Sequence, residues 1–135
     1  MAIQEMLTGG DPRSLGRTQE VVDEVLTKSL PIHELFECLF ARDEIVRMRA
    51  GDALEKVCRS HPEMVAPFTE RLLHDVPQVR QPSVQWHLAQ MLCALPLTDT
   101  QTDRAVRLLE DHHNLFRIVS AIVIRSGHGN GIGSA

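Results

Sequence analysis

Residues 43–57, DEIVRMRAGDALEKV, and residues 84–92, VQWHLAQML, decide the fold class of this chain. With an offset of 38 residues, apolar or small residues fall at matching positions, for example Val46 with Val84 and Leu54 with Leu92. Within each stretch the apolar residues recur every three or four positions, which is the spacing of one face of an α-helix. Two similar helical stretches at a fixed offset predict an internal repeat.

The same spacing continues along most of the 135 residues, and strand signals are scarce, with one Trp and no Tyr. We therefore predict an all-α chain. Prolines and capping residues set the expected helix boundaries. Helices are expected over residues 18–29 with Thr18 as cap, over 32–41 and 45–60, then in a pair starting near Pro62 and near Pro82 that ends at Pro96, and in a third pair whose first helix Thr98 caps.

A period of roughly 32 to 40 residues built from two antiparallel helices is typical of a helical solenoid, in which each pair buries its apolar face against its neighbours. We predict a short α-α superhelix of about three antiparallel helix pairs, of HEAT or armadillo type, with an additional N-terminal helix. Tetratricopeptide and ankyrin repeats fit the pattern less well. Residues 1–126 form the predicted single domain, and the Gly-rich residues 127–135 form a flexible tail.

Composition and charge argue against a general nucleic-acid-binding protein, a disulfide-bonded protein and a membrane-spanning protein. Hydrophobic residues make up 43% of the chain, which is enough for a globular core, and 14 Lys and Arg against 18 Asp and Glu give a net charge of −4. This balance disfavours a general nucleic-acid-binding surface. Three cysteines without a CxxC motif indicate reduced thiols, and no stretch has the length of a membrane span, so we expect a cytoplasmic protein that does not enter a membrane.

The stretch 43–57 resembles the HEAT-repeat consensus, an acidic turn followed by Val-Arg and a helix of small residues that ends in Ala-Leu. Together with residues 7–11 and 85–92, it is similar to a group of bacterial HEAT-repeat proteins over about residues 7–110. The resemblance implies the solenoid fold and a soluble bacterial protein, and it carries no established activity.

The second helix of each pair lines the inner groove of a solenoid, so its polar side chains are the candidates for contact with a partner. Arg and Trp are common anchors in interfaces. We predict a non-catalytic scaffold that binds a protein or peptide along this groove. The candidate partner-binding residues are Arg47, Arg49, Lys56, Gln85, Trp86, His87 and Gln90.

Structural roles compete with this interpretation at two of these positions. Arg47 is expected to pair with an acidic residue such as Asp43 or with a turn of the next repeat, and Trp86 could fill space between repeats.

Two other functions remain as alternatives. A nucleic-acid-binding or DNA-repair role would use the basic strip of Arg47, Arg49, Lys56 and Arg59, but Asp52 and Glu55 interrupt it. A metal-dependent hydroxylase of HEAT type needs four His-Glu pairs, and the chain has His33-Glu34 alone.

Three further features concern the second half of the chain and its motifs. Asp111, His112 and His113 have side chains that can coordinate a divalent ion, but adjacent side chains on a helix point in different directions, so we expect a loop between helices rather than a metal site. No P-loop, GxSxG or HExxH motif is present, so we predict neither a cofactor nor a catalytic site. The apolar residues 118–124 suggest a homodimer through Ile118, Ile122 and Ile124.

Overall fold

A computed structural model describes residues 2–11 and 14–110, and every regular element within them is a helix. The prediction of an all-α chain is therefore confirmed for this part. The longer elements are α1 (Ala2–Leu7), α2 (Thr18–Leu26), α3 (Ile32–Glu37), α4 (Glu44–Ser60), α6 (Thr69–His74), α7 (Pro82–Ala94) and α8 (Asp99–Glu110). Short turns connect them: η1 (Cys38–Phe40), α5 (Pro62–Val65), η2 (Ala66–Phe68) and η3 (Val76–Gln78).

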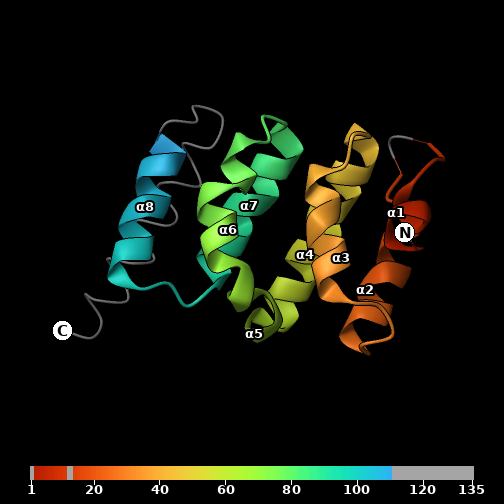
Figure 1. Ribbon diagram of the computed structural model, residues 1–135, viewed down its shortest axis with the longest axis horizontal. Helices are drawn as coiled ribbons and strands as arrows, with labels where there is room; N and C mark the ends of the chain where they lie inside the picture. Colours follow the sequence, from red (N-terminus) through yellow and green to blue (C-terminus); the bar gives the residue numbers. More distant parts are fainter. Residues whose placement is uncertain (1, 12–13, 111–135) are drawn as a thin grey trace.

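The helices stand side by side along the longest axis of the molecule, from α1 and α2 at one end to α8 at the other (Figure 1). Helix α4 is central, because it contacts α1, α2, α3 and α7. Helix α8 packs against α6.

The sequence explains why α4 is the longest helix. The carboxylate of Asp43 accepts a hydrogen bond from the backbone N–H of Ile45 at 2.8 Å, which caps the first turn. The helix ends at Ser60 because Pro62 disfavours helical backbone at His61. The predicted apolar stripe of this helix is fully buried: Val46, Ala50, Ala53, Leu54 and Val57.

The segment after Pro62 is a broken helix rather than a continuous one. Pro67 has no N–H for an intrahelical bond, and the chain passes through η2 between α5 and α6. Helix α7 starts with Pro82 at its first position, as predicted, and ends before Pro96. Its predicted core residues are all buried: Val84, Leu88, Met91, Leu92 and Leu95.

The predicted caps have opposite outcomes. The prediction for Thr98 is confirmed, because its hydroxyl accepts from the N–H of Gln101 at 3.1 Å while the Gln101 side chain accepts from the N–H of Thr98 at 3.0 Å. The prediction for Thr18 is wrong, since Arg17 occupies the cap position and the buried Thr18 hydroxyl donates to the carbonyl of Leu15.

Helix α2 ends at Leu26, three residues before the predicted end. Lys28 adopts a left-handed φ of 65°, and the N–H groups of Ser29 and Leu30 turn back to the carbonyl of Glu24. This left-handed turn reverses the chain before Pro31.

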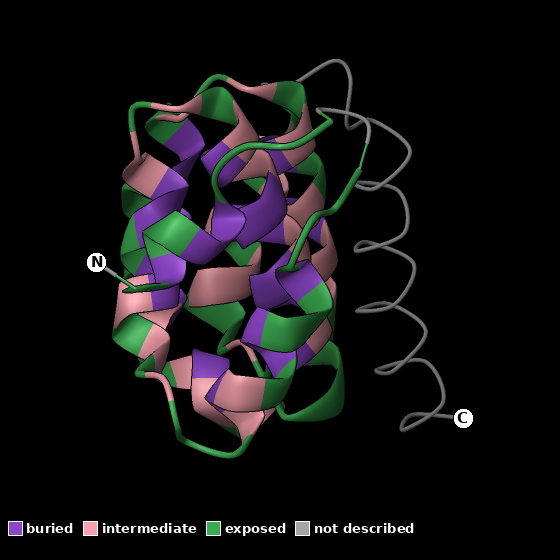
Figure 2. Ribbon diagram, turned by 90° about the vertical axis from the view of Figure 1, so that its right-hand side faces the viewer, coloured by how far each residue is buried: buried purple, intermediate pink, exposed green. Residues whose placement is uncertain are grey.

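The core is continuous from α1 to the middle of α8, from Ile3 at one end to Ala105 at the other. Figure 2 shows the buried residues gathered on the inward sides of the helices and the exposed ones on their outer sides. One face of α4 and one face of α7 therefore remain at the surface.

Candidate functional site

Helices α4 and α7 pack closely because Gly51 has no side chain. A Cβ atom at Gly51 would lie 3.2 Å from Cδ2 of His87, which is closer than most side-chain carbons approach each other. The Cys58 thiol of α4 lies 4.0 Å from the carbonyl oxygen of Met91 in α7. The two helices therefore form one surface, which carries most of the predicted partner-binding residues.

Four of the seven predicted residues have side chains at this surface. Trp86 is 46% exposed, whereas His87, Gln90 and Lys56 are half-buried. His87 Nδ1 lies 3.0 Å from Oε1 of Gln90, and the Lys56 ammonium lies 2.9 Å from Oδ2 of Asp52. We call the surface formed by Lys56, Trp86, His87 and Gln90 the α4–α7 face.

Arg49 is not on this face, which corrects the sequence prediction. Its side chain is 1% exposed, and its guanidinium donates to backbone carbonyls of the segment that joins α1 to α2. The acceptors are the carbonyl oxygens of Leu7 at 3.0 Å, Gly9, Asp11 at 2.9 Å and Ser14 at 3.1 Å. Arg49 therefore holds the N-terminal segment onto α4 and is not available to a partner.

Gln85 is also buried, at 6% exposure, and lies within α7 on the side that faces the core. Its side-chain amide donates to the carbonyl of Val79 at 3.4 Å. The prediction that it contacts a partner is therefore corrected as well, because a bound partner would not reach it.

Arg47 connects the turn that precedes α4 with the turn that precedes α7. Its Nε donates to Oε1 of Gln81 at 2.7 Å, and its Nη1 donates to the carbonyl oxygens of Ala41 at 2.7 Å and Arg42 at 3.0 Å. The Gln81 amide in turn donates to the carbonyl of Glu44 at 2.9 Å. Of the two expected partners, the Arg47 guanidinium binds Gln81 in the turn before α7; the Asp43 carbonyl accepts from the backbone N–H of Arg47 only.

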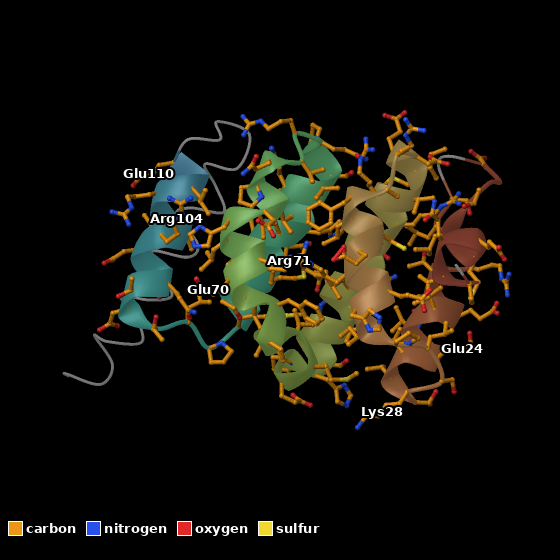
Figure 3. The ribbon with its side chains drawn as sticks, viewed as in Figure 1. Glu24, Lys28, Glu70, Arg71, Arg104 and Glu110 are labelled. Carbon is orange, nitrogen blue, oxygen red and sulfur yellow. The ribbon has the colours of Figure 1, made fainter. Side chains whose placement is uncertain are left out.

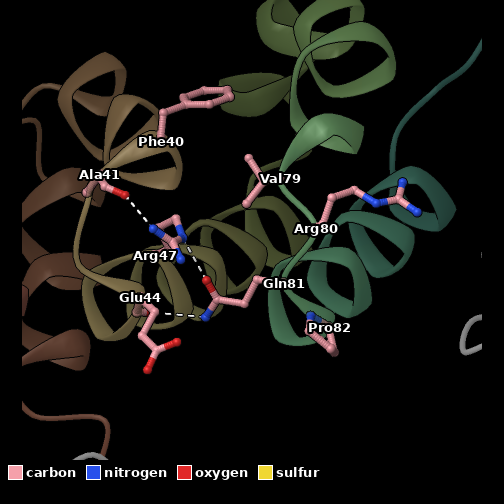
Figure 4. Close-up of a pocket in the computed structure, with 8 residues that line it drawn as sticks. All are labelled: Phe40, Ala41, Glu44, Arg47, Val79, Arg80, Gln81 and Pro82. Atoms are coloured by element: carbon pink, nitrogen blue, oxygen red, sulfur yellow. Dashed lines mark hydrogen bonds between the residues drawn. The ribbon is translucent and has the colours of Figure 1, made fainter.

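Beside Arg47 the surface contains a hollow of about 550 Å³ (Figure 4). This hollow was not predicted from the sequence. It lies between the turn that precedes α4 and the turn that precedes α7, so residues about 40 apart in the sequence form it. We call it the rim hollow. Its lining residues are Phe40, Ala41, Glu44, Arg47, Val79, Arg80, Gln81 and Pro82.

A smaller hollow of about 230 Å³ lies between α6 and α8, where Glu70 and Arg104 extend from the two helices (Figure 3). Glu70 accepts a hydrogen bond from Gln101 at 2.9 Å and lies 3.4 Å from Nε2 of His74. The polar side chains make this contact different from the apolar contact between α4 and α7.

Other candidate groups lie apart from both hollows. His33 is exposed on α3, and no three His, Cys, Asp or Glu side chains of residues 2–11 and 14–110 are grouped so that they could hold a metal ion. Burial raises the pKa of the Cys38 and Cys58 thiols to about 11, so both are protonated at neutral pH.

The remaining predicted residues lie outside the described part of the chain. They are Asp111, His112, His113, the dimer candidates Ile118, Ile122 and Ile124, and the tail 127–135.

None of the helices in the described residues is long and apolar enough to cross a bilayer. Comparison of the chain with models of protein families, with curated proteins and with solved structures finds no match in any of the three.

Proposed function

We propose that this chain is a short HEAT-like solenoid that binds a segment of another protein along the α4–α7 face and has no catalytic role. Two observations support the repeat interpretation. The offset of 38 residues pairs Ala50 with Leu88 and Leu54 with Leu92, and both pairs are buried. Arg47 and Gln81 link the turns of the two pairs, as expected for stacked repeats.

Trp86 carries the proposal for binding. It is one of two large hydrophobic residues that are exposed in the described part of the chain, the other being Leu15 at 42%. The same offset places Met48 at the position of Trp86 and Asp52 at the position of Gln90, so equivalent turns of α4 and α7 contribute to one surface. An exposed Trp flanked by half-buried polar side chains is typical of an interface hot spot.

The contacts of the basic residues weaken the nucleic-acid alternative. Arg49 and Arg47 bind carbonyls, Lys56 is paired with Asp52, and Nε of Arg59 donates to Glu55 at 2.9 Å. Arg49 is buried, and Lys56 and Arg59 are paired with carboxylates, so of these four cations Arg47 alone keeps a charge that no carboxylate neutralises, which is too little for a row of phosphates.

Affinity capture from a lysate with the wild-type chain, Trp86→Ala and Leu15→Ala tests this function. Leu15→Ala is the matched control, because it also removes an exposed apolar side chain. We expect a protein that wild type and Leu15→Ala retain and Trp86→Ala loses, in samples with and without nuclease.

Binding of the purified partner is then measured directly. Trp86 is the sole Trp and the chain has no Tyr, so tryptophan fluorescence reports on this face alone. Trp86→Ala should weaken binding, measured by calorimetry, by about 30-fold, which corresponds to about 2 kcal/mol. Equal affinity of Trp86→Ala and wild type would refute the proposal, and loss of retention after nuclease would favour nucleic acid.

A further inference from the structure

The rim hollow contains a guanidinium whose charge is not neutralised. Arg47 is held by three hydrogen bonds, all to uncharged oxygen atoms, and its Nη2 group has no bond to another described residue. Glu44 is the acidic residue of the lining, and Figure 4 shows its carboxylate directed away from Arg47. Arg47 is therefore a fixed cation with a free donor edge beside an open volume.

A second arginine raises the positive charge of the same hollow. Arg80 is exposed, and its guanidinium makes one long hydrogen bond to the described residues, from Nη1 to the carbonyl of Pro77 at 3.5 Å. Arg47 and Arg80 against Glu44 leave the lining with a net positive charge. A half-buried cation without an acidic partner, as at Arg47, favours an anionic ligand.

The other walls of the rim hollow are apolar. Phe40 and Val79 are half-buried and face the space above Arg47, and Pro82 lies at its lower edge (Figure 4). A fully hydrated ion such as inorganic phosphate would gain nothing from these walls. A volume of about 550 Å³ is in the range of pockets that hold small organic molecules.

We propose that the rim hollow binds a carboxylate carried on an apolar group, with the carboxylate at Nη2 of Arg47 and the apolar group between Phe40 and Val79. The ligand class includes the C-terminal residue of a peptide and a small free carboxylic acid. Arg47 supplies the fixed donor edge, and Arg80 adds attraction from the edge of the hollow. The site goes beyond the proposed function, because it needs no contact with the α4–α7 face.

Titration of the full chain with N-acetyl-leucine, followed by ¹H–¹⁵N NMR, tests the site. N-acetyl-leucinamide is the matched probe, because it has the same apolar group and no charge. We expect N-acetyl-leucine to shift the amide signals of Val79 and Gln81, binding to weaken as salt is added, and the amide probe to leave both signals unchanged. Equal shifts with both probes, or none with either, would overturn the proposal.

Variants distinguish the contribution of the positive charge to binding from the contribution of the cavity volume. Arg80→Gln should weaken N-acetyl-leucine binding a few-fold, because this exposed side chain adds attraction only. Arg47→Gln should weaken it about tenfold or more. Because Arg47 also holds the two turns together, Ala41→Phe provides a second route: it fills the hollow and leaves both arginines in place. Unchanged affinity in Ala41→Phe would also overturn the proposal.

Peptide and small-molecule ligands are then distinguished by a tripeptide that ends in leucine. Tighter binding of the tripeptide than of N-acetyl-leucine identifies a peptide C-terminus, and equal binding identifies a small carboxylic acid. Both results support a carboxylate site, whereas a tripeptide amide that binds as well as the free acid contradicts it.

Discussion

Helices α4 and α8 are attached to the rest of the chain in different ways. Around α4 the contacts are buried: the apolar stripe, the close approach at Gly51 and the four carbonyls that surround Arg49. Helix α8 contacts α6 through side chains such as Gln101 and Glu70 at the surface. Although α8 adds Ala105 to the core, we expect the stability of the described residues to depend more on the contacts of α4 than on those of α8, and four predictions test this expectation.

The largest effect is expected at Arg49. Arg49→Met keeps an apolar stem but removes the donors, so the carbonyls of Leu7, Gly9, Asp11 and Ser14 lose their partner. We expect the free energy of unfolding, measured with urea, to fall by about 3 kcal/mol. Arg17→Met is the control, because Arg17 and its ion-pair partner Glu20 are both exposed, so the loss of this pair should lower the free energy of unfolding far less. Equal effects of the two variants would contradict the comparison.

At Gly51 the expected effect is smaller. Gly51→Val places three carbon atoms where the first would already lie 3.2 Å from Cδ2 of His87, so α4 and α7 must separate or His87 must move. We expect a loss of about 2 kcal/mol in urea unfolding. Gly51→Ala should change stability by less than about 1 kcal/mol, because the gain in helix propensity offsets the tighter contact. Recovery of Gly51→Val by His87→Ala would identify this contact as the cause.

The sequence predicted the helices well, because the apolar residues of α4 and α7 follow the helical period over long stretches. Capping and Pro signals placed the ends of α4, α7 and the start of α8 within two residues. The sequence did not predict the end of α2, because Lys28, and not a glycine, adopts the left-handed conformation of the turn there.

The candidate site was predictable only in part. Trp86 and Gln90 are at the surface, as the helical period implies, whereas Arg49 is covered by the segment between α1 and α2. The position of that segment is set by the packing of α1 against α4. The spacing of apolar residues within α4 does not predict that packing. The rim hollow was missed for the same reason, since two turns about 40 residues apart form it.

The pH dependence of stability gives a third test of the region around α4. Burial raises the pKa of Cys58 from 9.0 to about 11, so the folded chain keeps a proton that the unfolded chain loses between these pH values. The free energy of unfolding should therefore fall as pH rises from about 9 to 11, by at most about 1.4 kcal/mol per pH unit from this thiol. Cys58→Ala should reduce the slope of urea stability against pH; an unchanged slope would mean that the thiol titrates equally in both states.

The smallest effect is expected at α8. Gln101→Ala removes the side-chain acceptor for the N–H of Thr98 and the bond to Glu70, while the Thr98 hydroxyl still accepts from the backbone N–H of residue 101, and we expect a loss of about 1 kcal/mol. Because α8 contacts the rest of the chain mainly through α6, this loss should appear as local opening. Hydrogen exchange should accelerate for the amides of α8 and stay unchanged for those of α4.

Gln101→Glu separates the two roles of this residue. The variant keeps a side-chain oxygen for the N–H of Thr98, but it places a second carboxylate beside Glu70, where the amide donated at 2.9 Å. Exchange in α8 should then accelerate at low salt and return towards the wild-type rate at high salt, because screening weakens the repulsion. If instead α4 and α8 accelerate equally in Gln101→Ala, the two helices open together, and the stability of α8 depends on the same buried contacts as that of α4.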